Sequence, residues 1–395
     1  MRVALVRQRY SAFGGAERFV ERALAALAAR DVSLTLITRE WSGQTQYPVI
    51  ICNPFHIGRL WRDWSFARCV SATMACERFS LVQSHERIAG CDVFRAGDGV
   101  HAAWLEARSR TLGPLARLAM RLSPWHRHTL VAEERMFCDP SLRAVICISR
   151  MVCDDIQRFF GVATDKLHVI YNGIDSADFS PRLRELHRDA LRARLGIPLS
   201  ATMFLYVGSG FDRKGVRQLL TAFAQLRNEN AYLVIVGKDK KQRVFEQQTQ
   251  ALGIQERLRF AGAQHDVRPF YGAADVFVLP TLYEPLSNAV LEALASGLPV
   301  ITSTRCGAAE LITQDESGYV CDPLDVDAIA AHMRTLLDPV LRESASLAAA
   351  RSVQHLTLEK MSEQYVRLYE KLLLDSAEPK AEGAPIAGRG DRHKI

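Results

Sequence analysis

The fold is decided by the stretch Pro280-Thr-Leu-Tyr-Glu284-Pro-Leu-Ser-Asn288-Ala-Val-Leu-Glu292-Ala-Leu-Ala-Ser-Gly297-Leu-Pro299-Val300. It follows the apolar run 276–279, which predicts a buried strand, and it leads into a second apolar run at 299–302. Between these runs the spacing predicts a helix that begins near Pro285 and stops at Gly297. A strand, a helix and a second strand in this order form the repeating unit of a parallel sheet.

The polar residues of this stretch predict a ligand site. In a parallel sheet, the loop after a strand and the start of the next helix face the ligand crevice. The backbone N–H groups of Ser287, Asn288 and Ala289 are therefore expected to receive an anion such as phosphate. Glu284 and Glu292 can each accept hydrogen bonds from sugar hydroxyls. A ligand that needs both kinds of partner is a sugar nucleotide.

The remaining chain predicts two domains of the same kind, since 395 residues exceed what one core usually holds. Strands are predicted in a first series at 3–6, 33–38, 81–85, 93–96, 144–148 and 168–171, and in a second series at 203–207, 232–236, 258–260, 276–279 and 300–302. Helices alternate with the strands in both series, which indicates two doubly wound α/β domains. A charged, loop-like segment separates the series and places the boundary near residue 175.

Glycine-rich and cationic loops follow other predicted strands. Gly14 and Gly15 stand between the first strand and the first helix, where they suit either the close approach of a ligand or a tight turn. Arg213 and Lys214 follow the strand 203–207. This pair can neutralise a diphosphate, and the alternative is a solvated surface pair. The segment 264–267 also follows a strand, so several loops converge on one edge and favour a ligand site.

Composition and targeting signals narrow the class of protein. No apolar run reaches the roughly 18 residues of a membrane span, and residues 1–7 predict a strand and a basic loop rather than a signal peptide. Nine cysteines without a Cys-x-x-Cys pair favour reduced thiols over a disulfide framework or a zinc site. The Asp325-Val-Asp327 motif follows a proline and is interpreted as a helix cap rather than a metal site.

Residues 107–132 form a basic, amphipathic stretch. It contains no acid and five arginines, Arg108, Arg110, Arg117, Arg121 and Arg127. Leu115, Leu118, Leu122 and Trp125 recur every three or four residues, as on one face of a helix. The pattern suits a helix that lies on an anionic membrane surface with Trp125 at the interface. The alternative is a helix whose leucines pack in the core of the N-terminal domain.

These motifs resemble those of the retaining glycosyltransferases of family four. The resemblance rests on Gly14-Gly15, on Arg213-Lys214 and above all on Glu284 and Glu292 followed by Gly297-Leu-Pro299-Val, and it covers about residues 1–375. Segments 13–15, 92–98 and 208–215 are most similar to those of the lipopolysaccharide core glucosyltransferases, which add glucose to the inner-core heptose.

The resemblance implies the GT-B fold, in which two doubly wound, Rossmann-like α/β domains face each other across a cleft. It implies an acceptor-binding domain over 1–175 and a nucleotide-sugar-binding domain over 176–354. It also implies that a helix over 355–375 packs back toward the N-terminal domain. The composition of 376–395, rich in Pro, Gly, Ala and charge, predicts a disordered tail.

The resemblance also implies roles for the residues of the C-terminal domain. Glu284 would hold hydroxyls of the donor hexose, Glu292 the ribose hydroxyls, and Arg213 with Lys214 the diphosphate. The backbone from Gln264 to Val267 would read the base.

On the N-terminal side, Gly14 and Gly15 would approach the donor from the opposite domain. Asp98 stands where many members of the family have a histidine-containing motif. Whether Asp98 or His101 touches the reacting sugar is left open, and either residue could instead cap a helix or shape a turn. We expect Asp98, Lys214 and Glu284 to be the catalytic residues.

The expected activity is the transfer of a hexose, expected to be glucose from UDP-glucose, to the inner-core heptose of lipopolysaccharide. No metal, cofactor or nucleic acid is expected to take part, and the protein is expected in the cytoplasm, peripherally bound to the inner membrane. The alternatives are a transferase for another glycan, such as exopolysaccharide or a glycolipid, a sugar-nucleotide epimerase of similar shape, and a non-catalytic sugar-nucleotide sensor. A nicotinamide dehydrogenase is disfavoured because the glycine fingerprint after the first strand is incomplete.

Overall fold

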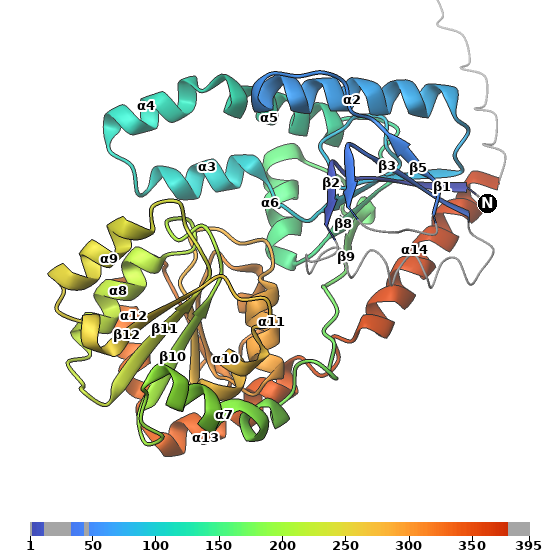
Figure 1. Cartoon of the computed structure of the whole chain (residues 1–395). Helices are drawn as coiled ribbons and strands as arrows, with labels where there is room; N and C mark the ends of the chain where they lie inside the picture. The colour runs from blue at the N-terminus through green and yellow to red at the C-terminus, as the bar shows by residue number, and fades with distance from the viewer. Residues whose placement is uncertain (1, 12–32, 43–46, 378–395) are drawn as a thin grey trace, which may run out of the picture.

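The protein consists of two α/β domains, shown one above the other in Figure 1. This computed structural model describes residues 2–11, 33–42 and 47–377. The N-terminal domain has a seven-stranded parallel sheet in the order β5 (Val49–Ile51), β3 (Ser33–Thr38), β1 (Arg2–Val6), β6 (Leu81–Ser84), β7 (Val93–Ala96), β8 (Ala144–Cys147) and β9 (Leu167–Val169). A short ribbon of β2 (Arg9–Ser11) and β4 (Glu40–Ser42) lies apart from it.

The C-terminal domain has a six-stranded parallel sheet. Its order is β12 (Leu258–Gly262), β11 (Ala231–Val236), β10 (Thr202–Val207), β13 (Val276–Leu279), β14 (Val300–Ser303) and β15 (Gly318–Cys321). Both sheets confirm the predicted doubly wound class. The sequence does not predict β5 or β15, because each is a short edge strand without a long apolar run.

Helices connect the strands in both domains. Those of the N-terminal domain are α2 (Gly58–Cys76), α3 (His101–Ser109), α4 (Pro114–Leu122), α5 (Pro124–Phe137) and α6 (Arg150–Phe160). Those that follow are α7 (Arg182–Leu195), α8 (Val216–Gln225), α9 (Gln242–Ala251), α10 (Arg268–Ala273), α11 (Asn288–Ala295), α12 (Val326–Thr335), α13 (Pro339–Ser352) and α14 (Leu358–Ala377). Single 3-10 turns occur at Thr164–Lys166, Gln255–Arg257 and Gly307–Leu311.

Both faces of the N-terminal sheet are buried, which explains the continuous apolar runs of its strands. Ala4 and Val6 face α2 and α5, whereas Val3 and Leu5 belong to the cluster that includes α14. Figure 1 shows α2 and α5 along one side of this sheet and α14 along the other. The alternation along β1 therefore distributes its side chains between two separate cores.

The last helix joins the two domains. It leaves the C-terminal domain and crosses to the N-terminal sheet, where Tyr365 accepts a hydrogen bond from Arg95 at 2.9 Å and Tyr369 bonds to Gln83. The chain thus passes between the domains twice. The two passages lie side by side, since the N–H of Ile174 donates to the carbonyl of Leu356 at 2.8 Å.

The basic stretch 107–132 forms parts of three helices rather than one. Gly113 and Ser123 separate α4 from its neighbours, and in the cartoon α4 lies at the end of the domain that is farthest from the chain's N-terminus. The leucines of α4 are exposed, with relative accessibilities of 84%, 55% and 62% at Leu115, Leu118 and Leu122. The alternative that they form core is therefore wrong.

Trp125 corrects another part of that prediction. It lies on α5, half-buried, where its indole N–H donates to Asp63 at 3.2 Å and the guanidinium of Arg59 stacks on its ring. Because Trp125 lies on α5 and not on α4, its ring points into the domain. Trp125 therefore does not share the exposed face of Leu118 and Leu122.

Two cysteines depart from the expectation of reduced thiols. Cys52, just after β5, and Cys69, on α2, are joined as a disulfide, with Cα atoms 5.7 Å apart. The two cysteines are 17 residues apart, and their spacing does not indicate that they form a disulfide. Only the packing of α2 beside β5 brings the two residues together. Seven other cysteines are free thiols.

Candidate active site

The site is built at the carboxyl end of β13, in the loop from Pro280 to Ser287. The helix that follows begins at Asn288, later than predicted, because two interactions hold the preceding residues outside it. The hydroxyl of Ser149 donates to the carbonyl of Pro285 at 2.7 Å, and the hydroxyl of Ser287 accepts from the N–H of Val290 at 3.4 Å as the N-cap. The helix stops before Gly297, whose φ of 76° is left-handed, as predicted.

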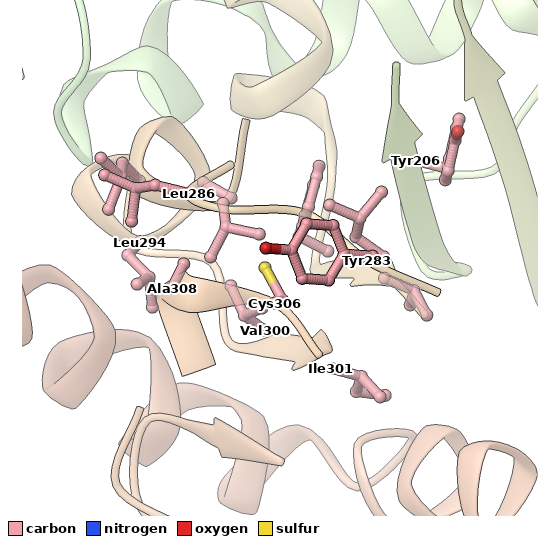
Figure 2. Packing of buried hydrophobic residues seen from close by; sticks show 14 of the residues in the cluster. Tyr206, Tyr283, Leu286, Leu294, Val300, Ile301, Cys306 and Ala308 are labelled. Carbon is pink, nitrogen blue, oxygen red and sulfur yellow. The ribbon is translucent and has the colours of Figure 1, made fainter. Parts of the chain in front are cut away.

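The core beneath this loop is apolar and tightly packed. Figure 2 shows the ring of Tyr283 beside the sulfur of Cys306, with Leu286 and Ala308 nearby. Tyr283 is almost completely buried, although Glu284, the next residue, is not. The buried tyrosine thus anchors the segment from which Glu284 extends.

Glu284 lies between the two cations that the sequence singles out. Its Oε2 is 3.2 Å from Nη1 of Arg213 and 3.3 Å from Nζ of Lys214. The side chains of Glu284 and Lys214 are only 14% and 13% exposed, whereas that of Arg213 is 41% exposed. The structure therefore brings all three predicted residues together, from the loops after β10 and β13.

A glycine permits this approach. Gly215 has a φ of 75°, and a Cβ at this position would lie 1.8 Å from the carbonyl oxygen of Pro280. The loop is also held by the N–H of Leu282, which donates to the carbonyl of Arg213 at 2.9 Å. Any side chain at position 215 would push the cationic loop away from Glu284.

The start of α11 faces the N-terminal domain. The side-chain amide of Asn172 donates to Oδ1 of Asn288 at 2.7 Å. Ser287 is buried, and Asn288 and Ala289 are partly exposed. The three residues predicted to bind an anion therefore lie at the boundary of the two domains, on the same loop and helix as Glu284.

Glu292 lies on the second turn of α11 and is partly buried. Its Oε2 accepts a hydrogen bond from the hydroxyl of Tyr271, on α10, at 2.8 Å. The loop before α10 carries Gln264, which is exposed, and Val267, which is partly exposed. Tyr271 thus connects the predicted ribose contact with the predicted base-reading loop.

Asp98 and His101 lie across the cleft, after β7. The N–H of Val100 donates to the hydroxyl of Tyr283 at 3.0 Å. The turn that carries Asp98 therefore lies against the loop in which Glu284 directly follows Tyr283. Gly99 makes this contact possible, because its φ is 66° and a Cβ there would lie 2.5 Å from that hydroxyl.

The two candidates on this turn have opposite environments. Asp98 is exposed, whereas His101 is buried and its Nε2 lies 2.9 Å from Nδ1 of His126. Burial, with the charge of Arg87 nearby, lowers the pKa of His101 to about 3. His101 is therefore neutral and buried at the start of α3, whereas the side chain of Asp98 is open to solvent.

Three residues complete a buried network that the sequence does not indicate. The hydroxyl of Tyr283 donates to Oδ2 of Asp155 at 3.0 Å, and Asp155 lies 3.4 Å from Nη2 of Arg305. Tyr283 lies in the stretch 280–300 that decides the fold, so its hydroxyl could have been considered as a polar group of the site. An aromatic residue at this position is equally compatible with a purely apolar core, however. Asp155 belongs to the other domain and carries no local pattern.

The remaining predictions concern Gly14, Gly15 and the Asp325-Val-Asp327 motif. Gly14 and Gly15 lie outside the described residues. The carboxylate of Asp325 accepts from the N–H of Ala328 at 2.9 Å, so the Asp-x-Asp motif is a helix cap as interpreted.

A cavity of about 1070 Å³ lies between the domains beside Arg213. Arginines and lysines at the end of α3, at the start of α8 and in the loops after β10 and β11 outnumber the two acids of its lining, Asp212 and Asp239, and they are Arg108, Arg110, Arg213, Arg217, Lys238, Lys240 and Lys241. The cavity offers space and positive charge for an anionic ligand beside Arg213.

Known proteins match each half of the chain. Residues 13–178 match the family described as Glycosyltransferase Family 4, and residues 187–350 match the Glycosyl transferases group 1. The chain is 27% identical over 352 residues to the lipopolysaccharide glucosyltransferase WaaG of Escherichia coli K12, covering 85% of this chain and 90% of that protein. It is 32% identical to the lipopolysaccharide core biosynthesis glycosyltransferase LpsD of Rhizobium meliloti, over 46% of this chain and 52% of that one.

Solved structures agree with this relationship. The crystal structure of WaaG superimposes with a TM-score of 0.79 at 26% identity, covering 93% of this chain and 99% of that chain. Anabaena Alr3699/HepE in complex with UDP-glucose has a TM-score of 0.69 at 19% identity, covers 94% of this chain and all of that chain, and shares the fold. The chain therefore belongs to the family-four glycosyltransferases with the GT-B fold and is related to the glucosyltransferases of the lipopolysaccharide core.

Proposed function

We propose that this glycosyltransferase moves glucose, with retention of configuration, from UDP-glucose to the inner-core heptose of lipopolysaccharide. The observation that carries the proposal is the position of Glu284 between Arg213 and Lys214, on a loop whose Tyr283 accepts a hydrogen bond from the turn after Asp98 in the other domain. The similarity to a lipopolysaccharide glucosyltransferase along most of both chains supports this choice of donor and acceptor.

The donor would lie across the carboxyl edge of the C-terminal sheet. Arg213 and Lys214 bind the diphosphate, Glu284 accepts hydrogen bonds from the hexose hydroxyls, and Glu292 accepts those of the ribose. The segment 264–267 contacts the base through its backbone. With donor bound, the two cations would exchange part of their contact with Glu284 for contact with phosphate oxygens.

The start of α11 adds to this charge. The N–H groups of Ser287, Asn288 and Ala289 would lie near the phosphates, and the helix dipole favours an anion there. Gly14 and Gly15 would close over the donor from the N-terminal domain.

The chemistry would follow a same-face route. The sequence marks no carboxylate as a nucleophile, because Glu284 would already bind hydroxyls of the donor hexose. The acceptor hydroxyl attacks the anomeric carbon from the face that the diphosphate leaves, and a departing phosphate oxygen takes its proton. Asp98 contacts the reacting sugars from the other domain. Arg213 and Lys214 stabilise the charge on the leaving group, so that the route requires no metal.

We also propose that the enzyme works at the cytoplasmic face of the inner membrane and binds its anionic surface through residues 107–132. The exposed leucines of α4, together with Arg117 and Arg121, support this contact. No helix within the described ranges is long and apolar enough to cross a bilayer.

A panel of nucleotide sugars with truncated lipopolysaccharide cores tests the proposal. Glucose transfer from UDP-glucose to a core that ends in inner-core heptose is expected, with the α configuration seen by NMR. Transfer only to another glycan would overturn the acceptor, and conversion of the nucleotide sugar without any acceptor would indicate an epimerase. A covalent glycosyl adduct trapped on Asp98 or Glu284 would overturn the same-face route.

A further inference from the structure

A separate cavity of about 410 Å³ lies inside the N-terminal domain, between α2, α5 and the loop that follows β6. It shares no lining residue with the cavity between the domains. Apolar residues such as Phe66, Ile88 and Val131 line it together with a similar number of charged and polar residues. Small-molecule sites commonly combine these two properties.

Two indole rings stand in the wall of this cavity. Trp64 comes from α2 and is 46% exposed, and Trp125 comes from α5. The ring of Trp125 is held in place, because its N–H donates to Asp63 and Arg59 stacks at 4.2 Å from its centroid. Flat, fixed aromatic surfaces suit the C–H faces of a pyranose ring.

Glu86 supplies a carboxylate to the same cavity. Its Oε1 accepts a hydrogen bond from the N–H of Gln8 at 3.0 Å, and no salt bridge neutralises Glu86 within the part of the chain that the structure describes. Burial raises the pKa of Glu86. A sheltered carboxylate of this kind is suited to accept hydrogen bonds from sugar hydroxyls.

Two arginines lie at the exposed rim. Arg68 stacks on the ring of Trp64 at 5.0 Å, and Arg135 extends from the last turn of α5. Neither forms a salt bridge among the described residues, whereas Arg87, deeper in the cavity, pairs with Glu133 at 2.8 Å. Guanidinium groups without a carboxylate partner favour an anionic ligand.

The cavity is connected to the reacting side of the molecule. Nη2 of Arg87 donates to the carbonyl of Gly99 at 3.3 Å, and Gly99 follows Asp98 directly. Building on the proposed function, we propose that this cavity is an acceptor subsite for a sugar that carries a negatively charged group. The sugar ring packs on Trp64 and Trp125, its hydroxyls bond to Glu86, and its charged group meets Arg68 and Arg135.

Direct binding tests the subsite without catalysis. The full chain is titrated with mannose 6-phosphate, and in parallel with mannose, inorganic phosphate and glycerol 3-phosphate, while tryptophan fluorescence is recorded. Mannose 6-phosphate is expected to bind about tenfold more tightly than each of the others, since it alone has both the ring and the charge. Equal binding of glycerol 3-phosphate or inorganic phosphate would show an anion site only and would overturn the proposal.

Variants locate the binding. Arg68→Ala with Arg135→Ala, and separately Glu86→Gln, should each weaken mannose 6-phosphate binding about tenfold. The matched controls are Arg78→Ala and Glu134→Gln, which lie outside the cavity and are exposed. Unchanged binding in both test variants would overturn the assignment of the cavity.

Transfer assays separate this inference from the proposed function. The same variants should raise the KM for the truncated core about tenfold and leave the Kd for the nucleotide sugar unchanged. Transfer with an unchanged KM would overturn the subsite alone. Absence of any hexose transfer, with variant-sensitive mannose 6-phosphate binding, would overturn the proposed function and the acceptor role, and would leave the cavity as a binding site for an anionic sugar.

Discussion

Lys214 is the residue whose replacement should affect chemistry most. Charge on the diphosphate increases as the glycosidic bond breaks, and Lys214 is sheltered beside Glu284. Lys214→Ala should therefore lower kcat by about 100-fold or more at saturating donor. Steady-state kinetics measure this, with the exposed Lys360→Ala as control. Near-normal turnover in Lys214→Ala would remove the residue from the diphosphate site.

Glu292 should behave differently, because a ribose contact exists in both the ground state and the transition state. Glu292→Gln should raise the Kd for the nucleotide about tenfold and change kcat by less than about threefold. The glutamine keeps an oxygen that can accept the hydrogen bond of Tyr271, so the fold should persist. Calorimetric titration with the nucleotide checks the prediction, and a loss confined to kcat would contradict it.

His101 should make stability depend on pH. Its folded-state pKa of about 3 lies below the ordinary value of 6.5, so the unfolded chain binds more protons between these two values. Stability should thus fall as the pH decreases from 6.5 toward 3, by at most about 1.4 kcal/mol per pH unit from this residue. The hydrogen bond to His126 also requires that one of the two ring nitrogens carries no proton.

Urea unfolding at pH 7.5 and 5.0 checks this dependence. His101→Phe should lose less stability between the two pH values than the wild type, and the exposed His355→Phe should match the wild type. An identical pH dependence in His101→Phe and wild type would contradict the assignment.

At the scale of single elements, α4 is the helix with the clearest expectation. Its leucines are exposed and Arg121 lies in its last turn. Arg117→Glu with Arg121→Glu should abolish most binding to anionic vesicles, since each arginine near the surface contributes about 1 kcal/mol. Vesicle flotation measures this, and the binding should also weaken with salt.

A matched control makes the same change in net charge at a part of the surface away from α4. Arg334→Glu with Arg351→Glu alters exposed residues on α12 and α13 and should leave vesicle binding near the wild-type level. Equal binding of the wild type to neutral and anionic vesicles would contradict the membrane prediction. So would unchanged binding after reversal of Arg117 and Arg121.

Elements with a local signal are those that the sequence predicts well. The strand that ends at Leu279 and the helix that contains Glu292 follow from periodicity, and the stop at Gly297 follows from turn chemistry. The start of α11 is missed by a few residues because Ser149, from the other domain, binds the carbonyl of Pro285. That interaction has no counterpart in the local sequence.

For the whole molecule, the Tyr283 network should couple the two domains. Its hydroxyl donates to Asp155 and accepts from the N–H of Val100, both in the N-terminal domain. Tyr283→Phe should lower the free energy of unfolding by about 1–3 kcal/mol, because it leaves buried partners unsatisfied.

A double-mutant cycle isolates the side-chain part of this coupling. Tyr283→Phe and Asp155→Asn, alone and together, should show a coupling energy of about 1 kcal/mol in urea unfolding. Strictly additive effects would show that the hydroxyl and the carboxylate do not stabilise the contact between the domains together.

By itself, the sequence determined the two doubly wound domains and the gathering of Arg213, Lys214 and Glu284 at one edge of the second sheet. Strand and helix periods, and the short loops that carry Arg213, Lys214 and Glu284, are local properties, so these residues could be placed at one sheet edge before any packing was known. Only the tertiary structure decided which partners meet across the chain. It separated Asp98 from the buried His101 and turned Trp125 inward. Those outcomes depend on contacts between residues that are far apart in the sequence. No pattern in the residues around each position indicates such contacts.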